Sequence, residues 1–540
     1  MDLFKTFLIA TIGIILYYLL LQWPSGSVIN DTSLIIGNKD ISVSNSDDLL
    51  TPLEFSTADG GFSNPTEPQA DSNFSSDFVL ENDVLALGVN GKSGRIVSSK
   101  LKKIKTEKGQ EEEFEIFGKT PSNFYFANSG FYSDSGYLDP NFRTQTSYVN
   151  DEGDIVFTLR GSNKGAVIER TVLLKRGKYY ATITDSFLMG EGLAAGITPY
   201  VVIQRSDEEV EEGGLAYTYL GPVFSTQKER FEKYSFGDIE DDKFTEDSVG
   251  GWASMIQHYF ATAWVSDQSK THRYQARKSS YTDRFSIGYT GASSAMSNEY
   301  PLLTTTNTLY VGPKLPAQLK EVHVDLDLVV DYGFLWWLGK PMYWLLNAGH
   351  DFLQNWGLAI IFLTVVLKIF TWPLSATAYK GMAKMRKFAP QLQALQSQNT
   401  GDKQKQSQEM MAFYKKEGIN PLSGCLPMLA QMPFFLAFYW VLMETVELRH
   451  SPFIFWIDDL SEMDPYFILP LLNAAGMYFS QKLTPTPANA DPMQAKMMKY
   501  FPLLFAGIFA FFPSGLVLYW LTNMLVTLFQ QWWYSRGVSE

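Results

Sequence analysis

The sequence predicts a polytopic α-helical membrane protein that carries a large all-β domain outside the cytoplasm. Apolar stretches of spanning length occur at the amino terminus and recur through residues 352–540. Residues 78–331 instead contain many short runs typical of β-strands. Charge divides at the same place, because residues 1–351 contain 30 Lys and Arg against 46 Asp and Glu, whereas residues 352–540 contain 14 against 11. The acidity of the chain therefore belongs to its first part, and DNA is not expected as a partner.

The amino-terminal segment, residues 1–24, is predicted to be an uncleaved membrane-spanning helix. Leu3–Trp23 is long enough to span, and no small-residue cleavage site precedes Trp23. A cleaved signal peptide is the competing interpretation. Residues 25–77 are rich in Ser, Asn, Asp, Gly and Pro and poor in large apolar residues, so they are predicted to form a flexible linker.

Residues 78–331 are predicted to form a large antiparallel β-sandwich. Short runs of β-branched and aromatic residues recur there, and clusters of Gly, Asn, Asp and Ser separate them. Strand runs broken by turn residues over so long a region are typical of sandwich domains. The clearest runs are Asp154–Arg160, Ala166–Lys175, Tyr179–Thr184 and Thr198–Gln204, and the alternation in Val322–Asp327 predicts the last strand.

Residues 332–351 are predicted to form an amphipathic helix that lies on the membrane surface. Gly339 and Pro341 interrupt this stretch, which is too broken for a span. Aromatic residues of amphipathic character favour the level of the lipid headgroups, and four of them occur within Phe334–Leu346. They are Trp336, Trp337, Tyr343 and Trp344.

Five further spans are predicted in the last part of the chain, which gives six in all. Two of them are shorter than the ~20 residues that a normal bilayer requires, which predicts a locally thinned membrane. Extramembrane segments separate the spans. The spans are residues 352–374, 424–445, 466–482, 498–512 and 514–534, and the other segments are 375–423, 446–465, 483–497 and 535–540.

Charge in these extramembrane segments predicts the orientation of the chain. Residues 375–423 contain eight Lys and Arg against three Asp and Glu, whereas Glu444–Pro465 contains six acids against Arg449 alone. Basic loops stay in the cytoplasm. Residues 375–423 and 483–497 are therefore expected inside, the acidic β domain outside, and both termini in the cytoplasm.

Lys368 is the principal candidate for a functional side chain, because it interrupts the apolar run Trp356–Pro373. A charge in a spanning segment costs a few kcal/mol or more and usually faces a helix bundle or a hydrated cavity. The alternative is that Lys368 extends to the interface, since Trp372 lies only four residues later, roughly 6 Å along a helix. The sequence leaves both interpretations open.

Residues 375–423 are predicted to form a helical hairpin outside the membrane. Met382, Met385, Leu392 and Leu395 have helical spacing, and Met410, Met411 and Tyr414 follow similarly. The methionines suit either ordinary core packing or an adaptable binding surface. A basic face is expected to meet anionic lipid, with ribosomal RNA as a second candidate. Its residues are Lys380, Lys384, Arg386 and Lys387.

Motifs of the common catalytic and metal sites are absent from the sequence. It contains no phosphate-binding glycine loop, no HExxH and no GxSxG. The five histidines lack metal-ligand spacing, and Cys425 is the only cysteine. We therefore predict neither an enzyme nor a bound metal or cofactor.

Several long motifs resemble the YidC-type family of membrane protein insertases. They are AKMRKFAPQLQAL, DKQKQSQEMMAFYKKEGINPLSGCLPMLAQMPFFLAFYW and DPMQAKMMKYFPLLFAGIFAFFPSGLVLYW. The acidic β domain after an uncleaved first helix is similar to the Gram-negative form, whose periplasmic domain is a β-supersandwich like that of sugar mutarotases. The resemblance implies a protein of the bacterial inner membrane.

The family implies a groove among five core helices that opens to the cytoplasm and to lipid and contains one cation. Lys368 falls at that position, although arginine is the usual residue there. Five further residues fall at positions that resemble the groove lining and a hydrophobic slide, and ordinary helix packing is the alternative for each. These are Thr364, Gln431, Met432, Tyr519 and Trp520.

The resemblance also implies the partners. Nascent membrane proteins would be the substrates, inserted and helped to fold alone or together with the Sec translocon and its accessory subunits, among membrane lipids. Family members often use a basic tail to recruit ribosomes, but residues 535–540 carry almost no basic charge. A ribosome would therefore contact mainly the hairpin.

Two other functions are weighed against insertion. A secondary transporter with an extracytoplasmic binding domain predicts inverted repeats and several polar residues within the membrane. A membrane-anchored carbohydrate-binding or epimerase domain would follow from the supersandwich resemblance. The sequence shows no convincing repeat and no paired acid and base.

Overall fold

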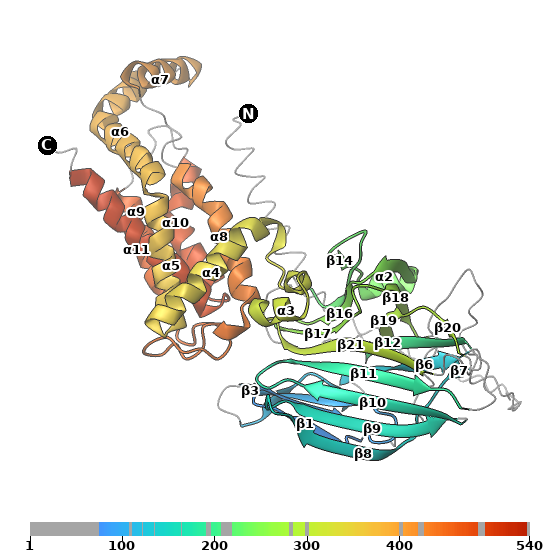
Figure 1. Cartoon of the computed structure of the whole chain (residues 1–540). Helices are drawn as coiled ribbons and strands as arrows, with labels where there is room; N and C mark the ends of the chain where they lie inside the picture. The colour runs from blue at the N-terminus through green and yellow to red at the C-terminus, as the bar shows by residue number, and fades with distance from the viewer. Residues whose placement is uncertain are drawn as a thin grey trace, which may run out of the picture. The chain divides into compact units, whose positions relative to one another are not determined.

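We analysed a computed structural model, in which the described residues fall into two compact units that meet at Gly312 and Pro313 (Figure 1). The predicted anchor, residues 1–24, and the linker up to residue 74 lie outside the described residues, as do most of the loop 483–497 and the last four residues of the tail. The structure describes residues 75–106, 111–120, 123–133, 136–163, 165–190, 196–206, 219–279, 284–296, 302–398, 403–418, 426–483 and 492–536.

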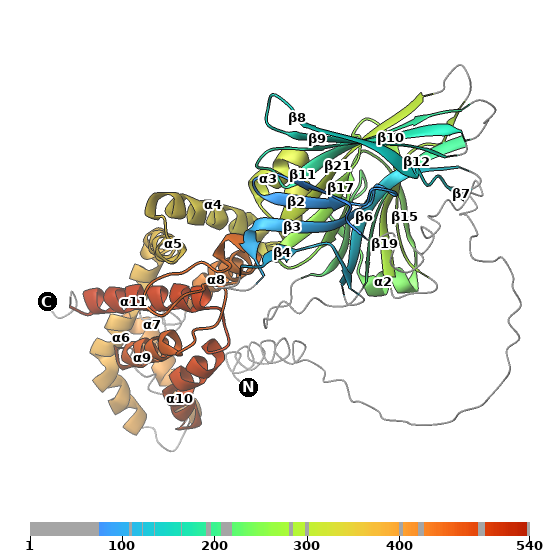
Figure 2. The ribbon, with the colours of Figure 1, turned by 90° about the horizontal axis from the view of Figure 1, so that it is seen from below.

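The first unit contains two antiparallel sheets that lie face to face (Figures 1 and 2). The larger has the strand order β1-β2-β3-β6-β12-β19-β18-β15, with four short strands added at its sides. Its strands are β1 Phe78–Glu81, β2 Leu85–Val89, β3 Ile96–Lys105, β4 Glu113–Glu115, β5 Gly118–Thr120, β6 Asn123–Ser133, β7 Gly136–Tyr137, β12 Gly196–Ser206, β15 Phe244–Val249, β18 Thr271–Lys278, β19 Arg284–Thr290 and β20 Ser294–Ala295.

The second sheet has nine strands in the order β14-β13-β16-β17-β21-β11-β10-β9-β8. The large all-β domain is thereby confirmed, and a strand lies at each of the four clearest predicted runs. The strands are β8 Phe142–Val149, β9 Ile155–Asn163, β10 Ala166–Leu174, β11 Tyr180–Leu188, β13 Gly221–Ser225, β14 Glu232–Lys233, β16 Trp252–Ile256, β17 Phe260–Val265 and β21 Leu302–Pro313; the short helix α2 is Phe236–Asp241.

Strand β10 shows why these residues fold as a sandwich. Its side chains alternate between buried and half-buried along the whole strand. Val172 and Leu174 point into the space between the sheets, while Thr171 faces outward and meets Thr158 of β9 at 3.1 Å. Alternation of this kind buries one face of a strand and leaves the other to solvent. The core is completed by large buried aromatic residues such as Trp252 and Trp264.

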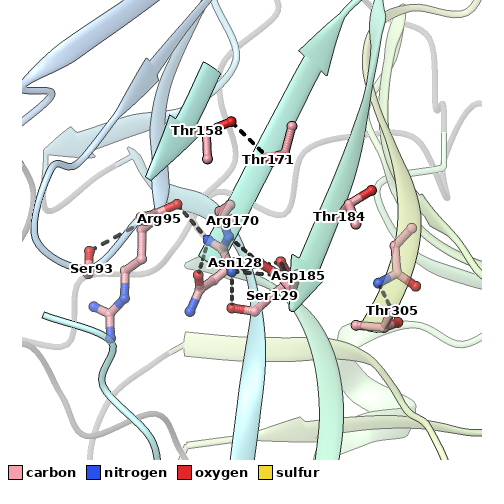
Figure 3. Close-up of polar contacts among 12 residues, drawn as sticks. Ser93, Arg95, Asn128, Ser129, Thr158, Arg170, Thr171, Thr184, Asp185 and Thr305 are labelled. Carbon is pink, nitrogen blue, oxygen red and sulfur yellow. Dashed lines mark hydrogen bonds and ion pairs between the residues drawn. The ribbon is translucent and has the colours of Figure 1, made fainter. Parts of the chain in front are cut away.

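A buried ion pair joins the two sheets (Figure 3). The guanidinium of Arg170 on β10 donates to Asp185 of β11, with 2.6 Å between Nε and Oδ1. It also donates to the Ser129 carbonyl on β6 and to the Gly94 carbonyl, at 2.6 and 2.7 Å. Asp185 in turn accepts a hydrogen bond from the Ser129 hydroxyl. Buried charges require such multiple partners, because each loses its hydration.

The prediction of a strand at Val322–Asp327 was wrong. The helix α3 spans Pro316–Val322, and a 3₁₀ turn, η1, spans Leu326–Val329. Pro316 favours a helix start, because the first helical position needs no N–H. Val324 is 71% exposed whereas Leu326 is fully buried, so the alternating apolar residues do not share one buried face. An alternating pattern of only six residues could not distinguish a strand from this helix and turn.

Helices make up the second unit after η1. A helix lies at the predicted surface segment, in both arms of the predicted hairpin and at each of the five later predicted spans. No single described helix is both long and apolar enough to cross a membrane, but Trp356–Phe370 and Ser375–Gly381, joined at a 65° bend, together meet that requirement. The elements are η2 Gly333–Leu335, α4 Trp336–Leu353, α5 Trp356–Phe370, α6 Trp372–Gln398, α7 Lys403–Glu417, α8 Leu426–Glu444, η4 Val446–Leu448, α9 Ile468–Leu483, α10 Pro492–Phe509 and α11 Ser514–Arg536.

Removal of the carboxylate from the inter-sheet ion pair tests its role. Asp185→Asn leaves the Arg170 guanidinium buried without a counter-ion, so we expect the β domain to lose about 3–5 kcal/mol of unfolding free energy. Asp247→Asn is the matched control, because Asp247 pairs with Arg273 at the surface of the same domain and exposed pairs contribute about 0–1 kcal/mol. Denaturant unfolding of both variants provides the measurement. Equal losses of unfolding free energy in the two variants would contradict a stabilising role of the buried ion pair.

Candidate functional site

Lys368 lies in the last turn of α5, where its side chain is buried against α11. Only 2% of the residue is exposed, and its ammonium donates a hydrogen bond of 2.8 Å to the Thr527 hydroxyl. That hydroxyl donates in turn to the Asn523 carbonyl, also at 2.8 Å. The described contacts therefore direct the ammonium toward another helix, 159 residues away in the sequence.

Polar residues on α11 form a row that the sequence analysis missed. Asn523, Thr527 and Gln530 are spaced at i, i+4 and i+7, which places them on one face of a helix. Gln530 is fully buried, and neither its amide oxygen nor its amide nitrogen has a hydrogen-bond partner within the described ranges. Asn473 of α9 is also buried and donates to the Val517 carbonyl at 3.1 Å, while its own oxygen has none. Helical spacing of polar residues within 514–534 was the signal that could have found this row.

The predicted lining residues differ in their surroundings. Thr364 lies one turn before Lys368, and its hydroxyl bonds the Ile360 carbonyl of its own helix at 2.7 Å. Tyr519 is buried, with its ring 4.6 Å from that of Phe438 on α8. Trp520 is half-buried and packs across Phe435 of the same helix at 4.9 Å. These aromatic contacts hold α8 against α11.

The remaining predicted residues lie on α8 and in the hairpin. Gln431 and Met432 on α8 are half-buried. Lys380 and Lys387 are exposed on α6, whereas the side chains of Lys384 and Arg386 lie outside what the structure describes. The structure thus brings Lys368 and Thr364 together on α5, and Tyr519 and Trp520 together on α11. Among the described contacts, none joins Gln431 or Met432 to Lys368.

The bend after α5 places Lys368 near a change of helix direction. Thr371 ends α5, and Pro373 lies at the start of α6. A proline restricts the backbone of the residue before it and lacks an N–H, so a helix usually breaks there. Trp372 closes the junction by donating from its indole nitrogen to the Tyr534 hydroxyl of α11 at 3.0 Å.

A second group of charges fastens the segment before α4 to the later helices. Lys314 is buried in an ion pair with Glu444 at the end of α8. Asp327 in η1 accepts from Lys340 of α4 at 3.0 Å. Tyr343 of α4 donates to Glu447 at 2.7 Å, and burial raises the pKa of that carboxyl. The outer side of α4 is aromatic, with Trp336, Trp337 and Trp344 exposed.

Comparison with known proteins gives the same family for both units. The family model described as "60Kd inner membrane protein" matches residues 348–540, and that described as "YidC periplasmic domain" matches residues 77–345. The "Membrane protein insertase YidC" of Haemophilus influenzae (strain PittEE) is 39% identical, over 90% of this chain and 91% of the relative. That of Azotobacter vinelandii is 37% identical, over 100% and 99%. A solved structure described as an active YidC insertase aligns over 84% of this chain and 92% of its own, with 15% identity and a TM-score of 0.38.

The hydroxyl that holds Lys368 can be removed with little change of shape. Thr527→Val leaves the buried ammonium without its described acceptor, so we expect a loss of about 1–3 kcal/mol of unfolding free energy. Thr522→Val is the control, because that buried hydroxyl bonds only the Leu518 carbonyl of its own helix and its loss is expected to be nearly neutral. Unfolding of the full chain in detergent micelles measures both, and a larger loss in the control would refute the assignment.

Proposed function

The chain belongs to the YidC family of membrane protein insertases of the bacterial inner membrane, and we propose that it inserts its clients through a hydrated groove around Lys368. The observation that carries this proposal is the buried ammonium on α5, which bonds Thr527 of α11. An ammonium in such a place favours water or an anionic group beside it, because burial alone destabilises the charge.

Unsatisfied amides on the neighbouring helices support hydration of this region. Gln530 and Asn473 are buried, with amide atoms that have no hydrogen-bond partner among the described residues. Buried polar atoms of this kind are commonly bonded by ordered water. Gln530 lies one turn after Thr527 on α11. Water around this row would supply the polar path that a hydrophilic segment needs.

The charge of Lys368 then acts on the client. Attraction between the ammonium and an acidic or polar segment is stronger in a medium of low dielectric constant than in water. The segment enters the groove from the cytoplasm and so crosses only part of the hydrocarbon. No nucleotide is required, because the client's own hydrophobic helix then moves into lipid and burial of ~20 apolar residues provides the driving force.

The half-buried side chains beside α11 suit the exit of that hydrophobic helix. Trp520 and Met432 retain exposed surface, whereas Thr364 and Tyr519 are buried and would act by packing. We propose that Gln431, Met432 and Trp520 contact the client as it leaves. The apolar part of α10, Tyr500–Phe509, is short, and a short span favours a thin bilayer that lowers the barrier further.

The proposed topology has six spans with both termini in the cytoplasm. The exposed tryptophans of α4 favour a position at the level of the headgroups. Exposed Lys380 and Lys387 on α6 would face the cytoplasm, where they favour anionic lipid and a translating ribosome. Cooperation with the Sec translocon and a role in client folding are further parts of this proposal.

Replacement of the buried ammonium tests the groove. Lys368→Met is expected to lower the insertion of clients with acidic translocated segments at least tenfold, which corresponds to about 1.4 kcal/mol of lost attraction. The insertion of clients without acidic translocated segments is expected to change much less. The Lys368→Arg variant is expected to retain most of the insertion activity. Protease protection of the translocated segment in cells depleted of the wild-type protein measures each effect.

The control for that experiment removes a different lysine. Lys482→Met also deletes one positive charge, but Lys482 is exposed at the end of α9, with its ammonium 4.7 Å from the centre of the Tyr478 ring. We expect normal insertion in this variant. If Lys368→Met inserted every client as well as the wild-type protein does, the proposed groove would be rejected.

Deletion of the β domain discriminates insertion from the sugar-domain hypothesis. The unit boundary places the cut after Gly312, because Lys314 binds Glu444 within the helical unit. We expect a chain lacking residues 78–312 to insert clients within about twofold of the full chain, whereas a chain lacking 78–320 loses the partner of Glu444 and becomes less stable. Complete loss of insertion in the shorter deletion, with normal membrane accumulation, would favour a function of the β domain.

A further inference from the structure

The outward face of the 12-stranded sheet carries two arginines with donor nitrogens that have no hydrogen-bond partner among the described residues. Opposite residues of neighbouring antiparallel strands point to the same face, and Ser129 on β6 points inward to Asp185. Tyr200 of β12 pairs in register with Gly130, the next residue of β6, and so belongs to the outward face. Its hydroxyl accepts from the Asn128 amide nitrogen at 3.1 Å, while the Asn128 oxygen accepts from Arg170 at 3.3 Å. Arg277 on β18 pairs in register with Ser286, which bonds Gln204 on that same face of β12.

Arg95 reaches this face from the residue before β3. Ile96 pairs with Ala127, so Arg95 lies beside Phe126 and Asn128, and its guanidinium lies 5.4 Å from the centre of the Phe126 ring. Figure 3 shows its side chain turned away from the Arg170 network, with no interaction drawn at its guanidinium. Asp139 attracts Arg95 electrostatically but forms no hydrogen bond with it.

Both guanidinium groups contain buried nitrogen atoms without a hydrogen-bond partner in the part of the chain that the structure describes. These atoms are Nε and Nη1 of Arg95 and Nε and Nη2 of Arg277. Each residue is only half-buried as a whole, so part of each side chain reaches solvent. A buried donor that lacks an acceptor in the protein calls for a water or an ion. Four such donors on two cationic groups favour an anion.

Other arginines of the same domain show that the fold supplies carboxylates where it needs a permanent pair. Arg273 lies on the same strand and the same face as Arg277, and it forms two bonds with Asp247, of 2.7 and 2.9 Å. Arg170 pairs with Asp185 between the sheets. Among the described residues, Arg95 and Arg277 form no such ion pair, although Asp139 lies close enough to attract Arg95, and this distinguishes the two positions.

Tyrosine side chains lie between the two arginines. Tyr137 on β7 interacts electrostatically with both guanidinium groups, and its ring meets that of Tyr200 edge to face at 5.0 Å. Tyr132 packs against both tyrosines. Their rings form an aromatic surface beside the four unpaired donors.

We propose that Arg95 and Arg277, with Tyr137 and Tyr200 between them, bind a phosphate monoester on the outward face of the 12-stranded sheet. Two guanidinium groups carry two positive charges, and a phosphate monoester carries close to two negative charges at neutral pH. Its three terminal oxygens can accept from all four donors, whereas a carboxylate has one charge and two oxygens. This site lies in the β domain and is independent of the proposed groove.

The charge state of the arginines is consistent with this ligand. Burial lowers the pKa of Arg277 to about 10 and also lowers that of Arg95. Arg277 nevertheless remains protonated at neutral pH, and an anion would restore the partner that its burial removes.

Titration of the full-length protein in a phosphate-free, detergent-free amphipol solution tests the site, with glycerol 1-phosphate as the soluble probe and vesicles containing phosphatidic acid as the lipid probe. We expect saturable binding that weakens at least tenfold in both Arg95→Gln and Arg277→Gln. Arg273→Gln, which removes a paired arginine from the same face, is expected to bind within twofold of wild type. Preference for the soluble ester or for the vesicles identifies the source of the phosphate, and either supports the site.

Thermal unfolding without ligand separates a binding role from a structural one. Arg277→Met removes an unpaired buried cation, so we expect it to raise the unfolding midpoint of the β domain and to abolish the stabilisation by glycerol 1-phosphate. A lowered midpoint in Arg277→Met would overturn the proposal. So would undiminished binding in both glutamine variants, or the absence of saturable binding of either probe to the wild-type protein.

Discussion

The helical unit depends on a partner for its buried charge, and the hydrogen bond between the Lys368 ammonium and the Thr527 hydroxyl supplies one. A charge taken out of water must find partners or destabilise the fold. Arg170 in the β domain meets this constraint with a carboxylate and two carbonyls. Lys368 has one neutral hydroxyl among its described contacts. The difference leaves Lys368 with donor capacity for water or a client, which a fully paired charge would lack.

The same constraint explains how the segment between the two units is held. After β21, Leu319, Leu326 and Val329 are buried, and Lys314 adds a buried ion pair with Glu444 on α8. Asp327 binds two lysines, Lys320 and Lys340, close by. Removal of one member of such a pair is costly, so these contacts tie α3, η1 and α4 to the end of α8. The position of α4 therefore depends on side chains that a boundary drawn from composition alone would assign to the other domain.

Local patterns in the sequence predicted the elements well and the contacts poorly. Alternation along Ala166–Leu174 and the apolar run from Trp356 onward reflect burial of each element, and burial leaves a local pattern. The same alternation misled at Val322–Asp327, where it was too short to outweigh the helix start at Pro316. Lys368 could be identified because it is a charge in an apolar run. Thr527 could not, because its importance lies in a contact with a residue 159 positions away.

By the resemblance, Lys368 stands where the family usually has arginine, and its surroundings suit a lysine. A guanidinium presents five donors in a planar fork, and a site with one hydroxyl acceptor would leave most of them unbonded. An ammonium is more compact, and Thr527 satisfies one of its three donors. Lys368 also lies in the last turn of α5, where the helix dipole stabilises positive charge. A lysine there combines one internal partner and a favourable dipole with two donors that remain for water or for an acidic segment of a client.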